Sequence, residues 1–167
     1  MEVIVDFQAF KDLSNKFIIK ELSILQSNKG TTKSFLFKPP LPFVRLSKTT
    51  QKQVRWLEKH YHNLRWSSGD TNYGDIIQII SDVAMMGKIF VTDLQKKRCI
   101  EEILSPFTTN FEVINLQDYG CKSLKSMKEN EILDCYSRCP FDHGSLNCSH
   151  INVHLLWKWW RINSRGF

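Results

Sequence analysis

The sequence of 167 residues lacks several features that would define a cellular location. It contains no apolar run of about eighteen residues, so we expect no transmembrane helix and no membrane association. The segment from Met1 to Asp6 carries an acid where a signal peptide carries basic residues, and no cleavage site follows it. We therefore expect an intracellular protein, either cytoplasmic or nuclear. Five cysteines, an odd number, fit reduced thiols and a metal site better than a disulfide framework.

Internal repeats and low-complexity linkers are absent too, and the length suits a single domain over residues 1–167. The hydrophobic content of 42% is sufficient for a full core. The net charge of +6 and the pI near 9.1 are compatible with an anionic partner. They do not establish one, because many basic domains bind nothing acidic.

The pattern of apolar residues predicts an alternation of strands and helices. Five strands are expected at residues 2–8, 17–25, 32–37, 88–92 and 111–116. Four helices are expected at residues 50–64, with Thr50 as the N-terminal cap, and at 75–86, 95–104 and 147–161. The order β-β-β-α-α-β-α-β-α predicts an α/β fold. A three-stranded meander followed by β-α-β crossovers would form a mixed sheet flanked by helices.

The last quarter of the chain concentrates residues that bind metals. Cys139, His143 and Cys148 place two thiols and an imidazole within ten residues, just before a segment rich in tryptophan. Thiolate and imidazole are the ligands that tetrahedral Zn²⁺ prefers, so we predict a zinc site. Only three ligands are local, and the fourth has to come from elsewhere.

Several residues compete for the fourth position. Cys135 is four residues before Cys139 and is the best local candidate. His150 and His154 are also open, although His150 would point roughly 200° away from Cys148 on a helix. Glu21 lies inside an apolar strand, where an unpaired charge is costly. It is a long-range candidate, unless that strand simply turns it towards solvent.

The predicted element order resembles the ribonuclease H-like fold in its DEDDh exonuclease branch. Such an exonuclease needs four carboxylates that bind two metal ions. The first strand should carry Asp-x-Glu, but here Asp6 is followed by Gln8. The acid expected after the fourth strand falls near Lys96 or Lys97, and the fifth residue after Cys148 is no acid. Asp6 is therefore a vestigial candidate, and we predict no catalytic residue.

What remains resembles the Maelstrom domain of the piRNA pathway, a DEDDh relative that lost its acids and carries a Glu-Cys-His-Cys zinc site. The resemblance implies that Glu21 binds zinc together with Cys139, His143 and Cys148. The chain departs from full-length Maelstrom proteins in having no HMG box. The start "VDFQ…KEL" and the end "CPF…H…C" also resemble, more loosely, insect proteins of uncharacterised or mobile-element origin.

Basic and aromatic residues alternate in two segments, as they would on a surface that contacts phosphates and bases. The candidate residues for nucleic-acid binding are Lys52, Arg55, Trp56, Lys59 and Arg65, with Trp66 nearby, and Lys158 and Arg161 beside the terminal tryptophans. A solvated helix face would explain the same charges.

These observations predict a zinc-stabilised, catalytically degenerate exonuclease-fold domain that binds nucleic acid, with RNA as the first candidate, in a silencing or mobile-element context. Two alternatives stay open. A residual 3'-5' exonuclease would use Asp6 with Asp93 or Asp82. A protein-interaction scaffold would bind protein partners in a silencing or mobile-element complex and show no salt-dependent binding of nucleic acid.

Overall fold

The computed structural model describes residues 1–130 and 139–164. The strands of this part are β1 (Glu2–Lys11), β2 (Phe17–Gln26), β3 (Thr31–Leu36), β4 (Lys88–Val91) and β5 (Val113–Asn115). Its α-helices are α1 (Lys48–His60), α2 (Ile76–Met86), α3 (Leu94–Leu104), α4 (Leu124–Asn130) and α5 (Ser149–Asn163). Short 3-10 helices occur at Phe43–Arg45, Tyr73–Asp75 and Leu116–Tyr119. No helix among the described residues is both long and apolar enough to cross a membrane.

The strands form one mixed sheet in the order β3-β2-β1-β4-β5. The strand β2 runs antiparallel to its neighbours β1 and β3, whereas β1, β4 and β5 are parallel to one another. The register between β1 and β2 shifts between Gln8 and Ala9, which marks a bulge near the end of β1. This arrangement confirms the predicted α/β fold, with a meander followed by parallel crossovers, and it is the sheet expected for a ribonuclease H-like domain.

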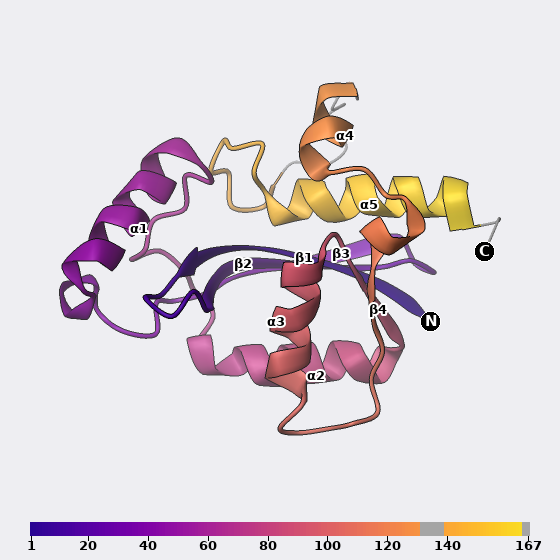
Figure 1. Cartoon of the computed structure of the whole chain (residues 1–167), viewed down its shortest axis with the longest axis horizontal. Coiled ribbons are helices and arrows are strands. Elements are labelled where there is room, and N and C mark those ends of the chain that lie inside the picture. Colours follow the sequence, from indigo (N-terminus) through magenta and orange to yellow (C-terminus); the bar gives the residue numbers. More distant parts are fainter. Residues whose placement is uncertain (131–138, 165–167) are drawn as a thin grey trace.

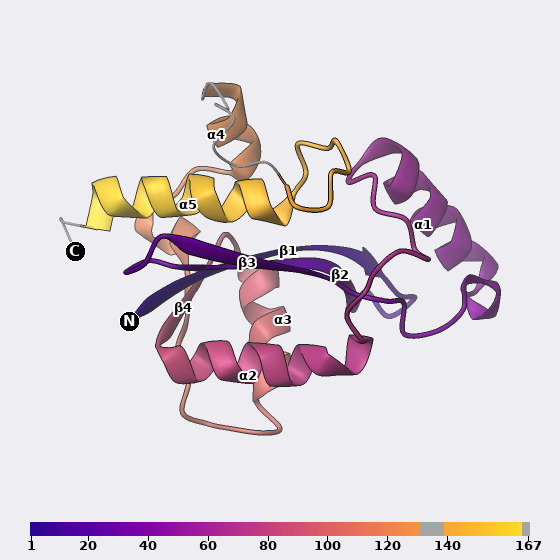
Figure 2. The same ribbon diagram turned by 180° about the vertical axis from the view of Figure 1, so that it is seen from behind.

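Helices cover both faces of the sheet, as Figures 1 and 2 show. The helices α2 and α3 lie on one face, and α5 crosses the other face with α4 beyond it (Figure 1). The helix α1 lies beyond one end of the sheet, near the start of α5. Because both faces of the central strands are covered, β1 and β2 are buried over most of their lengths.

The pleat of the sheet decides which residues face α5, because successive side chains of a strand point to opposite faces. On β1, Val3, Val5 and Phe7 belong to the core under α2 and α3. Ile4 packs instead with the apolar residues of α5. Asp6 shares the face of Ile4, and its carboxylate accepts a hydrogen bond from α5. On β2, the same alternation directs Glu21 towards α5.

Lys20, the neighbour of Glu21, fastens a loop to the sheet. Its ammonium is buried and donates to the carbonyl oxygens of Phe37 at 2.7 Å and Trp66 at 2.8 Å, and to that of Ser68. Burial lowers the pKa of Lys20 to about 8. Because three carbonyls from two separate segments converge on one cation, Lys20 holds the chain after α1 against the meander.

Two details of the predicted helices are wrong. The N-terminal cap of α1 is Ser47, whose Oγ accepts from the backbone nitrogen of Thr50 at 3.1 Å, so Thr50 lies inside the first turn. The helix ends at His60, and Leu64 packs outside it because the chain turns at His62 and Asn63, the latter with a φ of 57°. The short helix α4 was not predicted, since its seven residues carry no extended apolar pattern.

Candidate functional site

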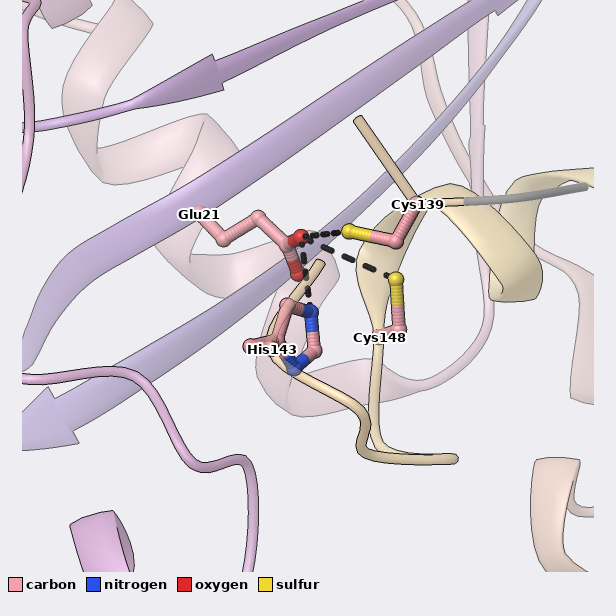
Figure 3. A group of neighbouring side chains, drawn as sticks. All are labelled: Glu21, Cys139, His143 and Cys148. Atoms are coloured by element: carbon pink, nitrogen blue, oxygen red, sulfur yellow. Dashed lines mark hydrogen bonds and ion pairs between the residues drawn. The ribbon is translucent and has the colours of Figure 1, made fainter. Parts of the chain in front are cut away.

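Four side chains from distant parts of the chain converge at the start of α5 (Figure 3). Glu21 comes from the middle of β2, Cys139 and His143 come from the loop before α5, and Cys148 caps α5. Each offers one ligand atom, and these atoms all lie within 4.8 Å of one another. The structure thus brings together the four residues that the Maelstrom resemblance implies.

The distances from Glu21 Oε1 to the other three ligand atoms fit a tetrahedral site. Glu21 Oε1 lies 3.3 Å from Cys139 Sγ, 3.2 Å from His143 Nε2 and 3.7 Å from Cys148 Sγ. Bond lengths of about 2.0–2.3 Å to zinc place the ligand atoms of one tetrahedron roughly 3.3–3.8 Å apart. The group can therefore hold a metal ion such as zinc with small adjustments of the side chains.

The loop that carries Cys139 and His143 has a defined conformation. The backbone nitrogen of Asp142 donates to the carbonyl of Cys139 at 3.2 Å, and Asp142 has a φ of 44°, which turns the chain sharply. Asn63 Nδ2 donates to the His143 carbonyl at 3.2 Å. Ser145 Oγ donates to the carbonyl of Tyr61 at 2.6 Å. These bonds dock the loop on the segment after α1.

Glu21 contributes to the site through both carboxylate oxygens. While Oε1 faces the thiols and the imidazole, Oε2 accepts from the backbone nitrogen of Ser149 at 2.8 Å. That nitrogen belongs to the first turn of α5, where unpaired N–H groups favour a negative charge. Burial alone would raise the pKa of Glu21, but the bonds from His143 and Ser149 lower it overall. The carboxylate is ionised and ready to act as a ligand.

Without a metal, a protonated His143 offsets only part of the negative charge of the group. Burial alone would lower the pKa of His143, but Cys139 and Glu21 raise it to about 10. The hydrogen bond between the two thiols lowers the pKa of Cys139 and raises that of Cys148, so one sulfur is the proton donor and the other the acceptor. A divalent cation would take the place of these shared protons, since zinc binds thiolate and neutral imidazole.

One atom of the site lacks the support usual for a zinc ligand. A ligating histidine ordinarily donates its second ring nitrogen to a neighbouring acceptor. Within the described residues, Nδ1 of His143 is buried and has no hydrogen-bond partner. The donor set fits zinc well, whereas the outer support of the imidazole is incomplete.

The rival fourth ligands are placed as follows. His150 Nδ1 is 3.1 Å from Ser34 Oγ, and His154 Nε2 is 3.0 Å from Thr32 Oγ1, so both imidazoles lie over β3. Neither belongs to the group of four. Cys135 lies outside the described residues.

A second polar centre surrounds Asp6 on the same face of the sheet. Its carboxylate is fully buried and pairs with the ammonium of Lys96. Asn152 Nδ2 donates to Asp6 Oδ2 at 2.7 Å, and Thr92 Oγ1 lies 3.4 Å from Oδ1. Burial raises the pKa of Asp6, although Lys96 and Asn152 act in the opposite direction. An ammonium and an amide thus contact Asp6 where a nuclease would place further acids.

The region of Lys96 is the one predicted from the sequence, whereas Asn152 was not predicted, because it lies four residues after Cys148 rather than five. The signal was an amide at helical spacing from Leu155 and Leu156, three and four residues later, on a face that is otherwise apolar. Such a buried amide requires a polar partner from another element.

The residues predicted to bind nucleic acid separate into two patches. Lys52, Arg55, Lys59 and Arg65 are exposed, and so is Trp56, which is 56% accessible. Lys158 and Arg161 are exposed at the far end of α5, and Arg161 stacks on Trp157 with 4.8 Å to the ring centroid.

Figures 1 and 2 place α1 and the end of α5 at opposite ends of the molecule, so one short ligand would not span both patches. Trp66 belongs to neither of them. It is only 3% accessible and packs on Phe10, so the expectation that it offers a stacking surface is wrong.

No known protein-family model matches the sequence, and a search of curated proteins finds none that is significantly similar. The fold and the site define an α/β chain whose mixed sheet is compatible with the ribonuclease H-like fold and whose buried group of four residues can hold a metal ion.

Proposed function

We propose that the chain is a zinc-stabilised, catalytically degenerate exonuclease-fold domain, similar to the Maelstrom domain, that binds nucleic acid, with RNA as the first candidate. The observation that carries the proposal is the buried Glu-Cys-His-Cys group at the start of α5. A structural metal there would lie apart from Asp6, where such a fold otherwise holds its two catalytic metal ions.

The zinc would be held by Glu21, Cys139, His143 and Cys148. Four protein ligands leave no open position, and a closed site of this kind stabilises a fold rather than activating water. Its effect would be to join β2, the loop before α5 and α5 itself. The metal would then position the helix that covers one face of the sheet.

Residual nuclease activity has less support. Asp82 accepts from Gln78 on α2, which lies on the opposite face of the sheet from Asp6. Asp93 caps α3 by accepting from the backbone nitrogen of Lys96 at 3.0 Å. The ammonium of Lys96 pairs with the carboxylate of Asp6 and would repel a divalent metal ion there.

Binding of nucleic acid is supported by charge and by exposed rings. The chain carries a net charge of +6, and the patch on α1 combines cations with the exposed ring of Trp56. Phosphates bind such cations without regard to sequence, while exposed bases stack on flat rings. A role in a silencing or mobile-element complex, with protein partners, follows from the resemblance and stays part of the proposal.

The test combines metal analysis with RNA binding. Purified protein should contain about one zinc per chain, and a labelled single-stranded RNA should bind with an affinity that falls steeply as salt rises. Changing Arg55 and Lys59 together to Ala should reduce the slope of log affinity against log salt by up to about 1.4, from roughly 0.7 per contact. The matched control changes Lys38 and Arg98, which are exposed and lie outside α1.

One outcome would move the binding surface away from α1, and two would contradict the proposal. A double variant at Arg55 and Lys59 that binds like the parent would remove α1 from the interface. Absence of RNA binding at low salt, in protein that contains zinc, would favour the scaffold alternative. Folded protein that takes up no zinc would remove the metal centre.

A further inference from the structure

A cleft of about 1040 Å³ lies beside the polar centre, at the carboxyl ends of β1 and β4. Its walls come from α1, α3, α4 and the loop before α5, and Asn152 and Lys96 line it. In open α/β sheets, ligands bind at the carboxyl ends of parallel strands. The cleft is also large enough for a small-molecule ligand or several groups of a longer one.

Asp6 and Lys96 together form an ion pair at this cleft. Asp6 has no exposed surface, whereas the side chain of Lys96 is 14% accessible and reaches the cleft. The ammonium therefore stands between the buried carboxylate and any ligand. A cation is already in place at Asp6, and a divalent metal would have to displace it.

Asn152 supplies a second and independent observation. It is 1% accessible, and its Nδ2 donates to Oδ2 of Asp6. Because the carboxyl group of Asp6 is paired with the ammonium of Lys96, it acts as the acceptor here, which fixes the orientation of the amide. The other end of the amide, Oδ1, is buried without a hydrogen-bond partner among the described residues. A buried acceptor without a partner is costly, so the site suits a ligand that brings a hydroxyl or another donor.

The remaining lining favours a ligand with negative charge. The cations of the cleft are Lys11, Lys96, Lys125 and Lys128, and the acids are Asp93 and Glu129. Asp93 is committed to capping α3, and Glu129 is exposed at the rim. Lys125 is exposed and has no acid engaged with it in the described structure, so it can reach a phosphate. Tyr61, 44% accessible, adds a flat ring to the wall of the cleft.

We propose that this cleft binds a ribonucleotide segment of an RNA strand without a divalent metal. Lys96 takes the place of the cation at Asp6, Asn152 Oδ1 accepts from a ribose hydroxyl, and Lys125 with Lys128 neutralises phosphate. The inference rests on the proposed binding of RNA and deepens it, because it names a binding site apart from the exposed face of α1 and a preference for ribose.

The experiment measures binding of a labelled single-stranded RNA and of the DNA of the same sequence to zinc-loaded protein, with no magnesium or manganese added. RNA should bind roughly 2- to 12-fold more tightly than DNA, the effect of one hydrogen bond to the hydroxyl. Added Mg²⁺ should weaken RNA binding by screening the phosphates and should not strengthen it. Lys125→Ala should weaken RNA binding and reduce the salt slope by about 0.7, whereas Lys122→Ala, an exposed lysine outside the cleft lining, should change neither.

Lys96→Asp tests the substitution of a metal by an ammonium. It places a second carboxylate beside Asp6, so the variant should gain a rise in Tm with Mn²⁺ that the parent and Lys96→Met do not show. If Lys96→Asp does not fold, the parent protein still tests whether the cleft works without a divalent metal. A parent Tm that rises with Mn²⁺, or RNA binding that requires Mg²⁺, would overturn the proposal.

Other results separate this site from the proposed function. Equal affinity for RNA and DNA would refute the role of Asn152. Weaker binding in the Arg55 and Lys59 double variant, with Lys125→Ala like the parent, would place the RNA on α1 alone and leave the proposed function intact. Loss of all RNA binding in the parent would overturn both.

Discussion

Replacing Glu21 by Gln tests the metal centre with the least change in shape. The amide has the size of the carboxylate but no charge, and it can accept through one oxygen only. In the structure, Oε1 faces Cys139, His143 and Cys148, while Oε2 accepts from Ser149. Whichever way the amide turns, its NH₂ group faces either the imidazole and thiols or the backbone N–H of α5.

The magnitude follows from the burial of these partners. Glu21 has no exposed surface, and the pKa of His143 is raised to about 10 in its presence, so a charged imidazolium loses its main acid. Removing one partner of a buried ion pair costs about 3–5 kcal/mol. For a domain of this size, 1 kcal/mol lowers the Tm by roughly 2–4 °C, so the metal-free variant should melt about 6–20 °C below the parent.

The assay is thermal unfolding with and without added zinc. The parent should gain about 2.7 kcal/mol at a zinc concentration one hundred times its Kd, while the variant should gain much less at the same concentration. Glu101→Gln is the matched control, because Glu101 is a half-exposed acid on α3 whose ion pair with Lys97 lies at the surface. A Glu21→Gln protein with the Tm, zinc content and zinc response of the parent would refute the reasoning.

Three further predictions concern the same face of the sheet and the segment after α1. Cys148→Ser should lower the zinc content well below one per chain and reduce the Tm, whereas Cys99→Ser should keep the metal; equal zinc in both variants, measured by elemental analysis, would contradict this. No shortening of labelled RNA is expected with Mg²⁺ or Mn²⁺, and activity that Asp6→Ala abolishes would overturn that expectation. Burial lowers the pKa of His62 to about 4, so its neutral form stabilises the fold above pH 6.5 and this contribution is lost as the pH falls through 4. His62→Gln should flatten that part of the curve of unfolding free energy against pH, and a curve identical to that of the parent would show that His62 does not contribute.

Local patterns in the sequence are sufficient to predict most of the fold. The alternation in β1 and β2, the hairpin turns and the helical spacing in α2 and α3 each depend on neighbouring residues, and all of these elements are found near their predicted positions. The end of α1 was misjudged because Tyr61 and Leu64 continue an apolar spacing of three and four. Leu64 is buried for a different reason, as part of the turn that His62 closes through its Nδ1.

The candidate site is less accessible to such reasoning. Cys139, His143 and Cys148 are close in sequence and attract attention as a group, but Glu21 lies 118 residues before Cys139. Only the sheet topology brings it near, and the residues alone left Cys135 and the two histidines of α5 as alternatives. The sequence also does not show which tryptophan is exposed. Trp56 and Trp66 lie in similar basic surroundings, but only Trp56 reaches solvent.

The long separation between Glu21 and its partners has a consequence for synthesis on the ribosome. At about 5–20 residues per second, the 118 residues that follow Glu21 take roughly 6–24 s to appear. During that interval the strands of the meander can pair. The carboxylate of Glu21, however, lacks both of its later partners, the imidazole of His143 and the first turn of α5. The nascent sheet therefore exposes that face to water until the last quarter of the chain emerges, and an interruption of translation before Cys139 would release a sheet that cannot bury its own acid.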